Sequence, residues 1–296
     1  MNCLENFIEY RPVLFAIAYR MLGSVVDAED MVQETFIRCQ QATQIPLHPK
    51  TYLSTIVTRL CIDYLRSARV QRERYVGSWL PEPLITEPYG VDRTELTESL
   101  SFAFLILLEC LSPIERAIFL LREVFDYDYE DIARIVDKSI PNCRQIFHRA
   151  RQHLVLRQPN INTSVQQKEQ IIERFLASWN QGDVKGLVAA MAENVTLWSD
   201  GGGQVVAALK PLYGSLKVAR FLSAIRASKL LPVFTSHTFQ INGQPGIINF
   251  VENHPQSVFC FEFDDGYVQS IFAVVNPDKL SLISSSIHLN PKSTIV

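Results

Sequence analysis

The sequence carries little net charge, no long apolar run and no pair of cysteines at a metal-binding spacing. Its 28 Lys and Arg residues against 31 Asp and Glu residues leave a formal charge of −3. A balance this small does not indicate a nucleic-acid-binding protein, so any such function must depend on where the charges lie. The cysteines form no CxxC pair and no Cys/His spacing typical of zinc. We therefore expect no zinc site. We also expect no other metal and no cofactor.

We also expect no export signal and no membrane-spanning segment. No basic stretch followed by an apolar one opens the N-terminus, as a signal peptide requires. The longest apolar run, Phe102 to Leu108, is too short to span a bilayer. Hydrophobic residues make up 47% of the 296 residues, which excludes a disordered chain and suffices for two or three domains. We expect a cytoplasmic protein of several domains.

Proline and glycine divide the chain into segments. Residues 1–74 have helical periodicity throughout, with an N-cap expected at Asp27. Residues 75–93 hold three prolines and two glycines and predict an extended linker, whose apolar side chains favour docking on another part of the protein. Residues 94–157 are helical again. Their Ser112-Pro113 step, with Glu115 following, predicts a capping box.

The last third of the chain predicts an α+β domain at 164–283, followed by a loose tail at 284–296. Its periodicity favours a few helices wrapped on a curved antiparallel sheet. The expected helices and strand-like runs are, in order, helices at 165–180, 184–191 and 215–230, and strands at 194–199, 204–209, 233–241, 246–251, 257–263 and 267–275.

A charge reversal inside the second helical segment indicates a DNA-binding helix. Residues 109–131 hold seven acidic residues against two basic ones, whereas residues 132–157 hold six basic residues against one acidic one. Two helices, joined by a tight turn at Asp137-Lys138, have the spacing of a helix-turn-helix. On the second helix, basic residues can neutralise phosphates, and Asn142 and Gln145 can read base edges. The alternative is an ordinary solvated helix, but the tight turn and the capped entry favour DNA.

Two further stretches of the first segment indicate partners. Arginines between positions 59 and 74, with tyrosines interleaved, suit a single strand whose bases stack on aromatic rings. The proline-containing loop 43–50 before Tyr52 would form a rim for an extruded base. The acidic stretch 27–34 is unsuited to DNA but offers a face to a basic protein partner. By itself, each pattern also fits a solvated helix face.

Three segments resemble the extracytoplasmic-function (ECF) sigma factors of bacterial RNA polymerase. DAEDMVQETFIR (27–38) resembles the polymerase-binding part of region 2, and YLSTIVTRLCIDYLRSAR (52–69) resembles its −10-reading helix. The segment from Leu111 to Leu154 resembles region 4, which reads the −35 element. The resemblance implies a sigma factor that directs core RNA polymerase to promoter DNA, with two all-α domains, a region 2 bundle and a region 4 helix-turn-helix.

WLPEP (79–83), DGGG (200–203) and NPDKL (276–280) resemble the motifs of one subgroup, whose C-terminal extension is SnoaL-like. That extension is a cone-shaped α+β domain of the nuclear-transport-factor-2 superfamily. The resemblance implies that it regulates the sigma factor in place of a separate anti-sigma protein. Gln204 follows the glycines where a basic residue is expected.

The resemblance and the charge pattern together give four sets of candidate residues. Polymerase binding is assigned to Asp27, Glu29, Asp30, Gln33, Glu34 and Phe36. The −10 element is assigned to Tyr52, Arg59, Arg66, Arg69, Arg72 and Arg74. The −35 element is assigned to Lys138, Asn142, Arg144, Gln145, His148, Arg149 and Arg151. Interdomain contacts are assigned to Trp79, Leu80, Pro81, Glu82, Pro83, Asp200, Gly201, Gly202, Gly203, Asn276, Pro277 and Asp278.

Two alternatives stay open at this point. The C-terminal fold class also contains enzymes, and the candidates for acid–base chemistry are Asp200, Tyr213, His237 and Glu262. We expect no catalysis, and a small ligand in this domain is the more plausible addition. The second alternative is a DNA-binding repressor with a ligand-sensing C-terminal domain that never contacts polymerase.

Overall fold

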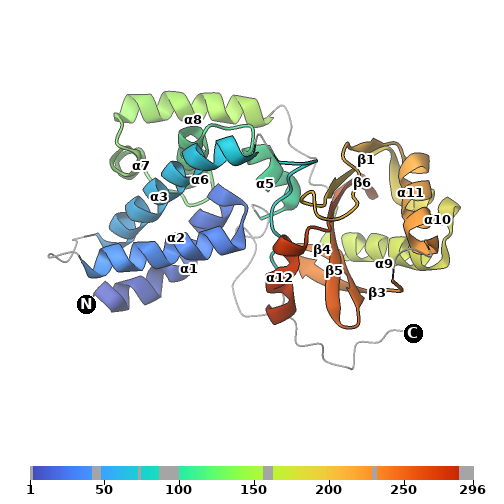
Figure 1. Ribbon diagram of the computed structural model, residues 1–296. Helices are drawn as coiled ribbons and strands as arrows, with labels where there is room; N and C mark the ends of the chain where they lie inside the picture. Colours follow the sequence, from blue (N-terminus) through green and yellow to red (C-terminus); the bar gives the residue numbers. More distant parts are fainter. Residues whose placement is uncertain are drawn as a thin grey trace. The chain divides into compact units, whose positions relative to one another are not determined.

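The structure is a computed structural model that describes residues 3–41, 48–72, 75–86, 100–155, 163–228 and 232–286. It divides into two compact units (Figure 1). The first combines Met1–Arg74 with Phe104–Gln158, and the second combines Tyr75–Ala103 with Pro159–Val296. The linker after the first helical segment thus belongs to the same unit as the C-terminal domain.

Helices build the first unit. They are α1 (Cys3–Leu22), α2 (Val25–Gln40), α3 (Pro49–Arg72), α6 (Pro113–Glu123), α7 (Tyr129–Val136) and α8 (Ile140–Val155), together with most of α5 (Phe102–Leu108). The prediction of an N-cap at Asp27 is wrong. The cap is Ser24, whose hydroxyl accepts a hydrogen bond from the Asp27 backbone N–H at 3.1 Å. A serine hydroxyl satisfies a free N–H of the first turn, so α2 begins three residues earlier.

The entry into the helix-turn-helix follows the local sequence. The predicted capping box is confirmed, because Ser112 accepts from the Glu115 N–H and the Glu115 side chain accepts from the Ser112 N–H. Asp128 caps α7, and Asp137 ends it in the left-handed conformation with φ of 53°. That conformation turns the chain sharply into α8.

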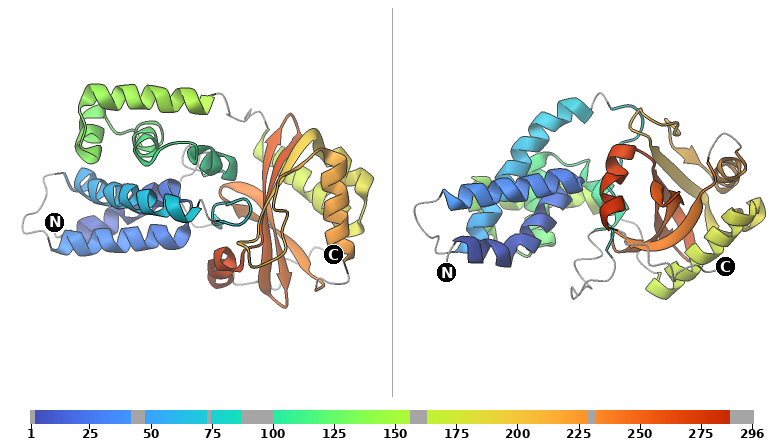
Figure 2. Two further views of the ribbon diagram at one scale, coloured as in Figure 1. Left: turned by 45° about the horizontal axis from the view of Figure 1, so that its top comes forward. Right: turned by 60° about the horizontal axis from the view of Figure 1, so that its bottom comes forward.

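The second unit is a six-stranded sheet with helices on both sides. Its elements are α9 (Val165–Gln181), α10 (Val184–Ala190), β1 (Met191–Asp200), β2 (Leu212–Tyr213), α11 (Ser215–Ala227), β3 (Thr235–Ile241), β4 (Gln244–Val251), β5 (His254–Asp264), β6 (Tyr267–Val274) and α12 (Pro277–Ser286). The strand order is β2-β1-β6-β5-β4-β3. Helices α9, α10 and α11 cover one face, while α12 lies on the other (Figure 2).

Two sequence expectations for this domain are wrong. The run 204–209 is not a strand. The backbone N–H groups of Gln204 and Val205 instead donate to the Gly201 carbonyl and close a turn. The sheet is also not wholly antiparallel, because β1 pairs with β6 in the parallel sense. A hydrophobic run shows that a strand can form, but it does not fix the strand's direction or its partner.

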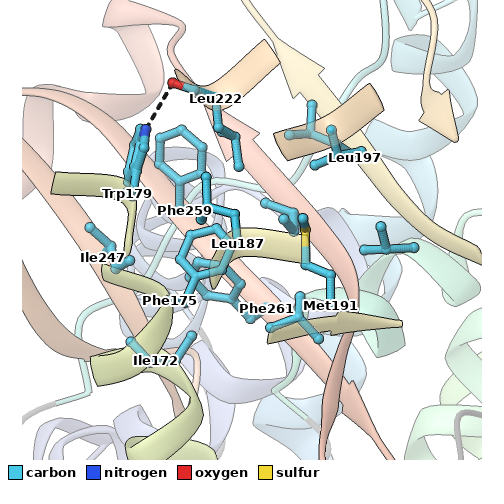
Figure 3. Close-up of a cluster of buried hydrophobic side chains, with 14 of the residues drawn as sticks. Ile172, Phe175, Trp179, Leu187, Met191, Leu197, Leu222, Ile247, Phe259 and Phe261 are labelled. Carbon is cyan, nitrogen blue, oxygen red and sulfur yellow. Dashed lines mark hydrogen bonds between the residues drawn. The ribbon is translucent and has the colours of Figure 1, made fainter. Parts of the chain in front are cut away.

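Aromatic and aliphatic side chains together fill the space between the sheet and helices α9, α10 and α11 (Figure 3). Phe175 meets Phe261 edge-on, with ring centroids 5.3 Å apart, and Trp179 meets Phe259 at 4.9 Å. The indole N–H of Trp179 donates to the Leu222 carbonyl at 2.9 Å, which satisfies its one polar group in the core. The alternate residues of β5 face the opposite side of the sheet, where α12 packs.

Candidate nucleic-acid and polymerase interfaces and the linker contact

The second helix of the helix-turn-helix presents its polar candidates to solvent. Cys143, Ile146, Ala150 and Leu154 form its buried face. The predicted −35 residues on α8 are all exposed, namely Asn142, Arg144, Gln145, His148, Arg149 and Arg151. Lys138 is half-buried in the preceding turn. The helix therefore offers a continuous polar and basic surface without losing its packing.

The predicted −10 residues described on α3 follow one side of the helix. Tyr52, Arg59 and Arg66 are spaced seven residues apart and therefore share a face. Arg66 is exposed and pairs with Asp63 at 3.1 Å. Arg59 instead donates to the backbone carbonyls of Ile135 and Arg134 at 2.8 and 2.9 Å.

Some of the −10 predictions lie wholly or partly outside the described residues. Arg69 and Arg72 lie in α3, but the structure does not describe their side chains. Arg74 lies outside the described residues, as does most of the predicted rim.

Some of the predicted polymerase-binding residues on the acidic helix α2 form contacts within the protein, and others are exposed. Glu29 pairs with Arg11 at 2.6 Å, and Glu34 pairs with Arg38 at 2.7 Å. Asp27 is half-buried in the first turn. The Phe36 ring packs against Phe7, with centroids 4.7 Å apart. Of these candidates, Asp30 and Gln33 are exposed and the other four are half-buried.

The sequence reasoning missed two apolar residues on the same face of α2. Val26 is 43% exposed and Ile37 is 47% exposed. With Asp30 and Gln33 they form a stripe at helical spacing. Apolar residues flanked by an acid and an amide are typical of a protein-binding surface. Their spacing relative to Asp30 is the signal that could have found them.

Asp200, the last residue of β1, is the centre of the contact between the linker and the C-terminal domain. Its carboxylate has no exposed surface and accepts four hydrogen bonds. Two donors come from the linker: the Tyr75 hydroxyl at 2.6 Å and the Leu80 N–H at 2.8 Å. The other two are the Lys279 ammonium at 2.8 Å and the Gly202 N–H at 3.0 Å. A buried carboxylate is stable only when its oxygens are satisfied in this way.

Lys279 also binds the linker directly. Its ammonium donates to the Leu80 carbonyl and lies 4.4 Å from the centroid of the Trp79 ring. Leu80 itself is buried. The Tyr75 hydroxyl also accepts from the Asn276 amide at 3.0 Å. Burial and the hydrogen bond to Asp200 raise the pKa of Tyr75 above its usual value. We call Tyr75, Leu80, Asp200, Asn276 and Lys279 the linker clasp.

The glycines of the DGGG motif are required by the backbone around the linker clasp. Gly202 has a φ of 61°, and a Cβ there would lie 2.4 Å from the Asn276 amide nitrogen. A side chain at this position would therefore displace Asn276. Gln204 donates to the Asp278 carboxylate at 2.6 Å, so an amide makes the contact for which a basic residue was expected. Tyr75 and Lys279 were not predicted as contacts, although Lys279 lies within NPDKL.

The linker makes a second contact farther along. The Asn242 N–H donates to the Leu84 carbonyl at 2.7 Å, and the Leu84 N–H donates to the Asn242 side-chain oxygen at 2.8 Å. The Thr86 N–H donates to the Gln240 carbonyl at 2.9 Å. Ile85 forms an isolated antiparallel bridge with Ile241. The linker thus covers part of the edge strand β3, whose backbone groups would otherwise be available for pairing. The apolar side chains of the linker had favoured docking, but no motif indicated β3 as the partner.

The four candidates for acid–base chemistry are not brought together. Asp200 belongs to the linker clasp, Tyr213 is 63% exposed, and His237 packs against the Phe250 ring. Glu262 is buried on the α12 side of the sheet and accepts from the Ala103 N–H at 3.3 Å. Burial raises its pKa. Within the described ranges, these four side chains share no hydrogen bond with one another.

The comparisons with known proteins divide the chain in the same order as its helical segments. Residues 7–70 match the model of Sigma-70 region 2, and residues 102–154 match that of Sigma-70 region 4. Together, these two modules define a promoter-recognition subunit of RNA polymerase.

The relatives cover nearly the whole chain. The ECF RNA polymerase sigma factor SigJ of Mycobacterium tuberculosis is 30% identical over 94% of this chain and 93% of its own length. The probable ECF sigma factor SigI of the same species is 28% identical, covering 92% of each. The crystal structure of M. tuberculosis SigJ matches with a TM-score of 0.72 at 28% identity, covering 94% of this chain and 98% of that one.

The chain belongs to the ECF sigma factors and directs RNA polymerase to specific promoters. The repressor alternative is therefore wrong. Among the solved structures similar to part of this chain is that of an NTF2-like protein from Burkholderia xenovorans, which covers 42% of this chain and 99% of that one at 20% identity with a TM-score of 0.28. The sigma-factor relatives point to a regulator of transcription. No helix in the described ranges is long and apolar enough to cross a membrane.

Proposed function

We propose that the C-terminal domain regulates this sigma factor by holding the linker between regions 2 and 4 in the linker clasp. The observation that carries the proposal is the buried Asp200 carboxylate, which binds the linker through both Tyr75 and Leu80. A linker fixed at these points restricts the positions that the two DNA-reading regions can take. The domain limits that we propose are 1–74 for region 2, 75–93 for the linker, 94–157 for region 4, 164–283 for the regulatory domain and 284–296 for the tail.

The contacts with polymerase and DNA are part of the same proposal. The exposed α8 residues would enter the major groove at the −35 element. Tyr52, Arg59 and Arg66 on α3, with the arginines that follow, would bind the melted −10 strand. Asp30 and Gln33 of α2, flanked by Val26 and Ile37, would contact core polymerase. The protein would act in the cytoplasm, where the polymerase works, without catalysing a reaction of its own. A ligand in the C-terminal domain stays a prediction.

Promoter-specific run-off transcription with reconstituted polymerase tests the regulatory role. Asp200→Asn keeps the size of the side chain but removes the charge that Lys279 and the linker require. We expect it to change run-off output while binding to core polymerase is retained. Asp264→Asn, at the far end of β5, is the matched control and should leave output unchanged. Equal output from the Asp200 variant and the parent chain would rule out regulation through the linker clasp.

A further inference from the structure

Regions 2 and 4 are packed against each other within the first unit, and α3 makes much of that contact. The Ser54 hydroxyl and the Tyr127 hydroxyl are 2.6 Å apart in a buried hydrogen bond. Burial raises the pKa of Tyr127. Beside this pair, the Thr51 hydroxyl donates to the Asp131 carboxylate at 3.4 Å. The helix assigned to the −10 element therefore uses its flank to hold region 4.

Two arginines cap helix ends across this contact, one from each region. Arg59 of α3 donates through Nε and Nη2 to the Ile135 and Arg134 carbonyls in the last turn of α7. Arg116 of α6, only 3% exposed, donates to the Met21 carbonyl at the end of α1 at 2.6 Å. The last carbonyls of a helix lack partners within the helix and carry its partial negative charge. A guanidinium is well suited to bind them.

Arg59 lies in the middle of the face that Tyr52 and Arg66 define. Two of its nitrogens, which could bind a phosphate bidentately, are already engaged by α7. Arg66 lies seven residues further along α3. The hydrogen bond described for it goes to Asp63 on the same helix. The packed state thus occupies the centre of the −10 face and leaves Arg66 exposed.

We propose that α7 of region 4 and the melted −10 strand are mutually exclusive partners of α3, with Arg59 binding one or the other. The proposal rests on the −10 role proposed above for α3. Separation of α3 from α7 is then a required step before Arg59 engages DNA. DNA that binds Arg59 must favour the separated state, and the packed state must weaken DNA binding by the same factor.

A reversible cross-link provides the decisive test. In Thr51→Cys/Asp131→Cys, oxidation joins α3 to α7 and dithiothreitol separates them again. The readouts are permanganate reactivity of the −10 thymines and run-off product, at a promoter that the parent holoenzyme transcribes. We expect the oxidised form to lose both at least tenfold and to regain them on reduction. The parent chain under the same treatment controls for reaction at native cysteines.

Three results would overturn the proposal. The first is melting by the oxidised variant equal to that of its reduced form. The second is failure of the two cysteines to join, even through a short bismaleimide, because the packed arrangement itself would then be absent. The third concerns a variant that cross-links normally when oxidised and binds polymerase. If this variant, after reduction, melts no promoter that the parent melts, the proposal fails. By contrast, a parent chain that never melts DNA would refute the −10 role itself.

A milder variant tests the same equilibrium without a cross-link. Tyr127→Phe removes the hydroxyl that bonds Ser54 and changes no residue assigned to DNA. Loss of one buried hydrogen bond corresponds to about a fivefold shift toward the separated state. We expect promoter melting to rise by up to that factor, whereas Arg66→Ala should lower it with no change in the cross-linking rate. Unchanged melting with Tyr127→Phe would contradict the competition.

Discussion

Replacing Asp200 by asparagine should release the linker from the C-terminal domain. The carboxylate is fully buried, and its partner Lys279 is 9% exposed. Removing one member of a buried ion pair typically costs about 3–5 kcal/mol, because the other charge stays buried and unpaired. Asparagine keeps one acceptor oxygen for Tyr75, Leu80 and Gly202, so we take the lower limit. About 3 kcal/mol corresponds to roughly a 150-fold increase in the released population.

Hydrogen exchange at the Leu80 amide measures this release directly. That N–H donates to Asp200, so its exchange reports opening of the linker clasp. We expect its protection to fall about 150-fold in Asp200→Asn, while amides in the core of β5 keep theirs. Unaltered exchange at Leu80 would refute the reasoning.

A double-mutant cycle separates the ion pair from the other contacts. Lys279→Met removes the unpaired ammonium while keeping an apolar chain against the Trp79 ring. The double variant should therefore release the linker no more than Asp200→Asn alone, because no buried charge remains. If the free-energy costs of the two single variants simply add in the double variant, the two side chains act independently, contrary to their 2.8 Å contact.

Two further predictions follow from the remaining geometry. The pKa of Tyr75 is raised in the folded state, chiefly by burial and then by the hydrogen bond to Asp200. The protonated Tyr75 hydroxyl therefore stabilises the linker clasp fully below about pH 10, and this stabilisation is lost as the pH rises above that value. Leu80 exchange measured between pH 9 and 11, after correction for its intrinsic rate, should show this loss in the parent and not in Tyr75→Phe. Arg144→Ala with Arg149→Ala should weaken −35 DNA binding and lower its salt slope by about 2, and an unchanged slope in a salt titration would count against the α8 assignment.

Local signals in the sequence predicted the helical half of the fold. The Ser112 capping box, the tight turn at Asp137 and the polar face of α8 are each set by a few neighbouring residues. The run 204–209 failed because its apolar residues fit a strand, whereas the preceding glycines let the chain close a turn on Gly201. Local preference could not reveal that β1 finds its second neighbour in Leu212 and Tyr213.

The sequence motifs predicted which segments take part in the candidate sites, but not which side chains they contact. DGGG and WLPEP indicated a contact, but the partners of Asp200 depend on how the end of β1 meets the linker and α12. Tyr75 directly follows the run of arginines, and nothing in its local sequence indicated that its hydroxyl binds Asp200. The pairing of Ile85 with Ile241 depends on β3 being an edge strand, which only the assembled sheet decides.

Linker docking and the packing of α3 on α7 should oppose the same step by different routes. The segment 75–86 is held at both the linker clasp and β3, which removes up to about 40 Å of extended reach from the connection between regions 2 and 4. The Arg59 and Tyr127 contacts act directly between those regions. The two sets share no residue, so their effects on promoter melting should multiply in Asp200→Asn/Tyr127→Phe if they act independently. An effect of the double variant no larger than that of Asp200→Asn alone would instead mean that releasing the linker already separates α3 from α7, which would make the linker clasp the control point for both.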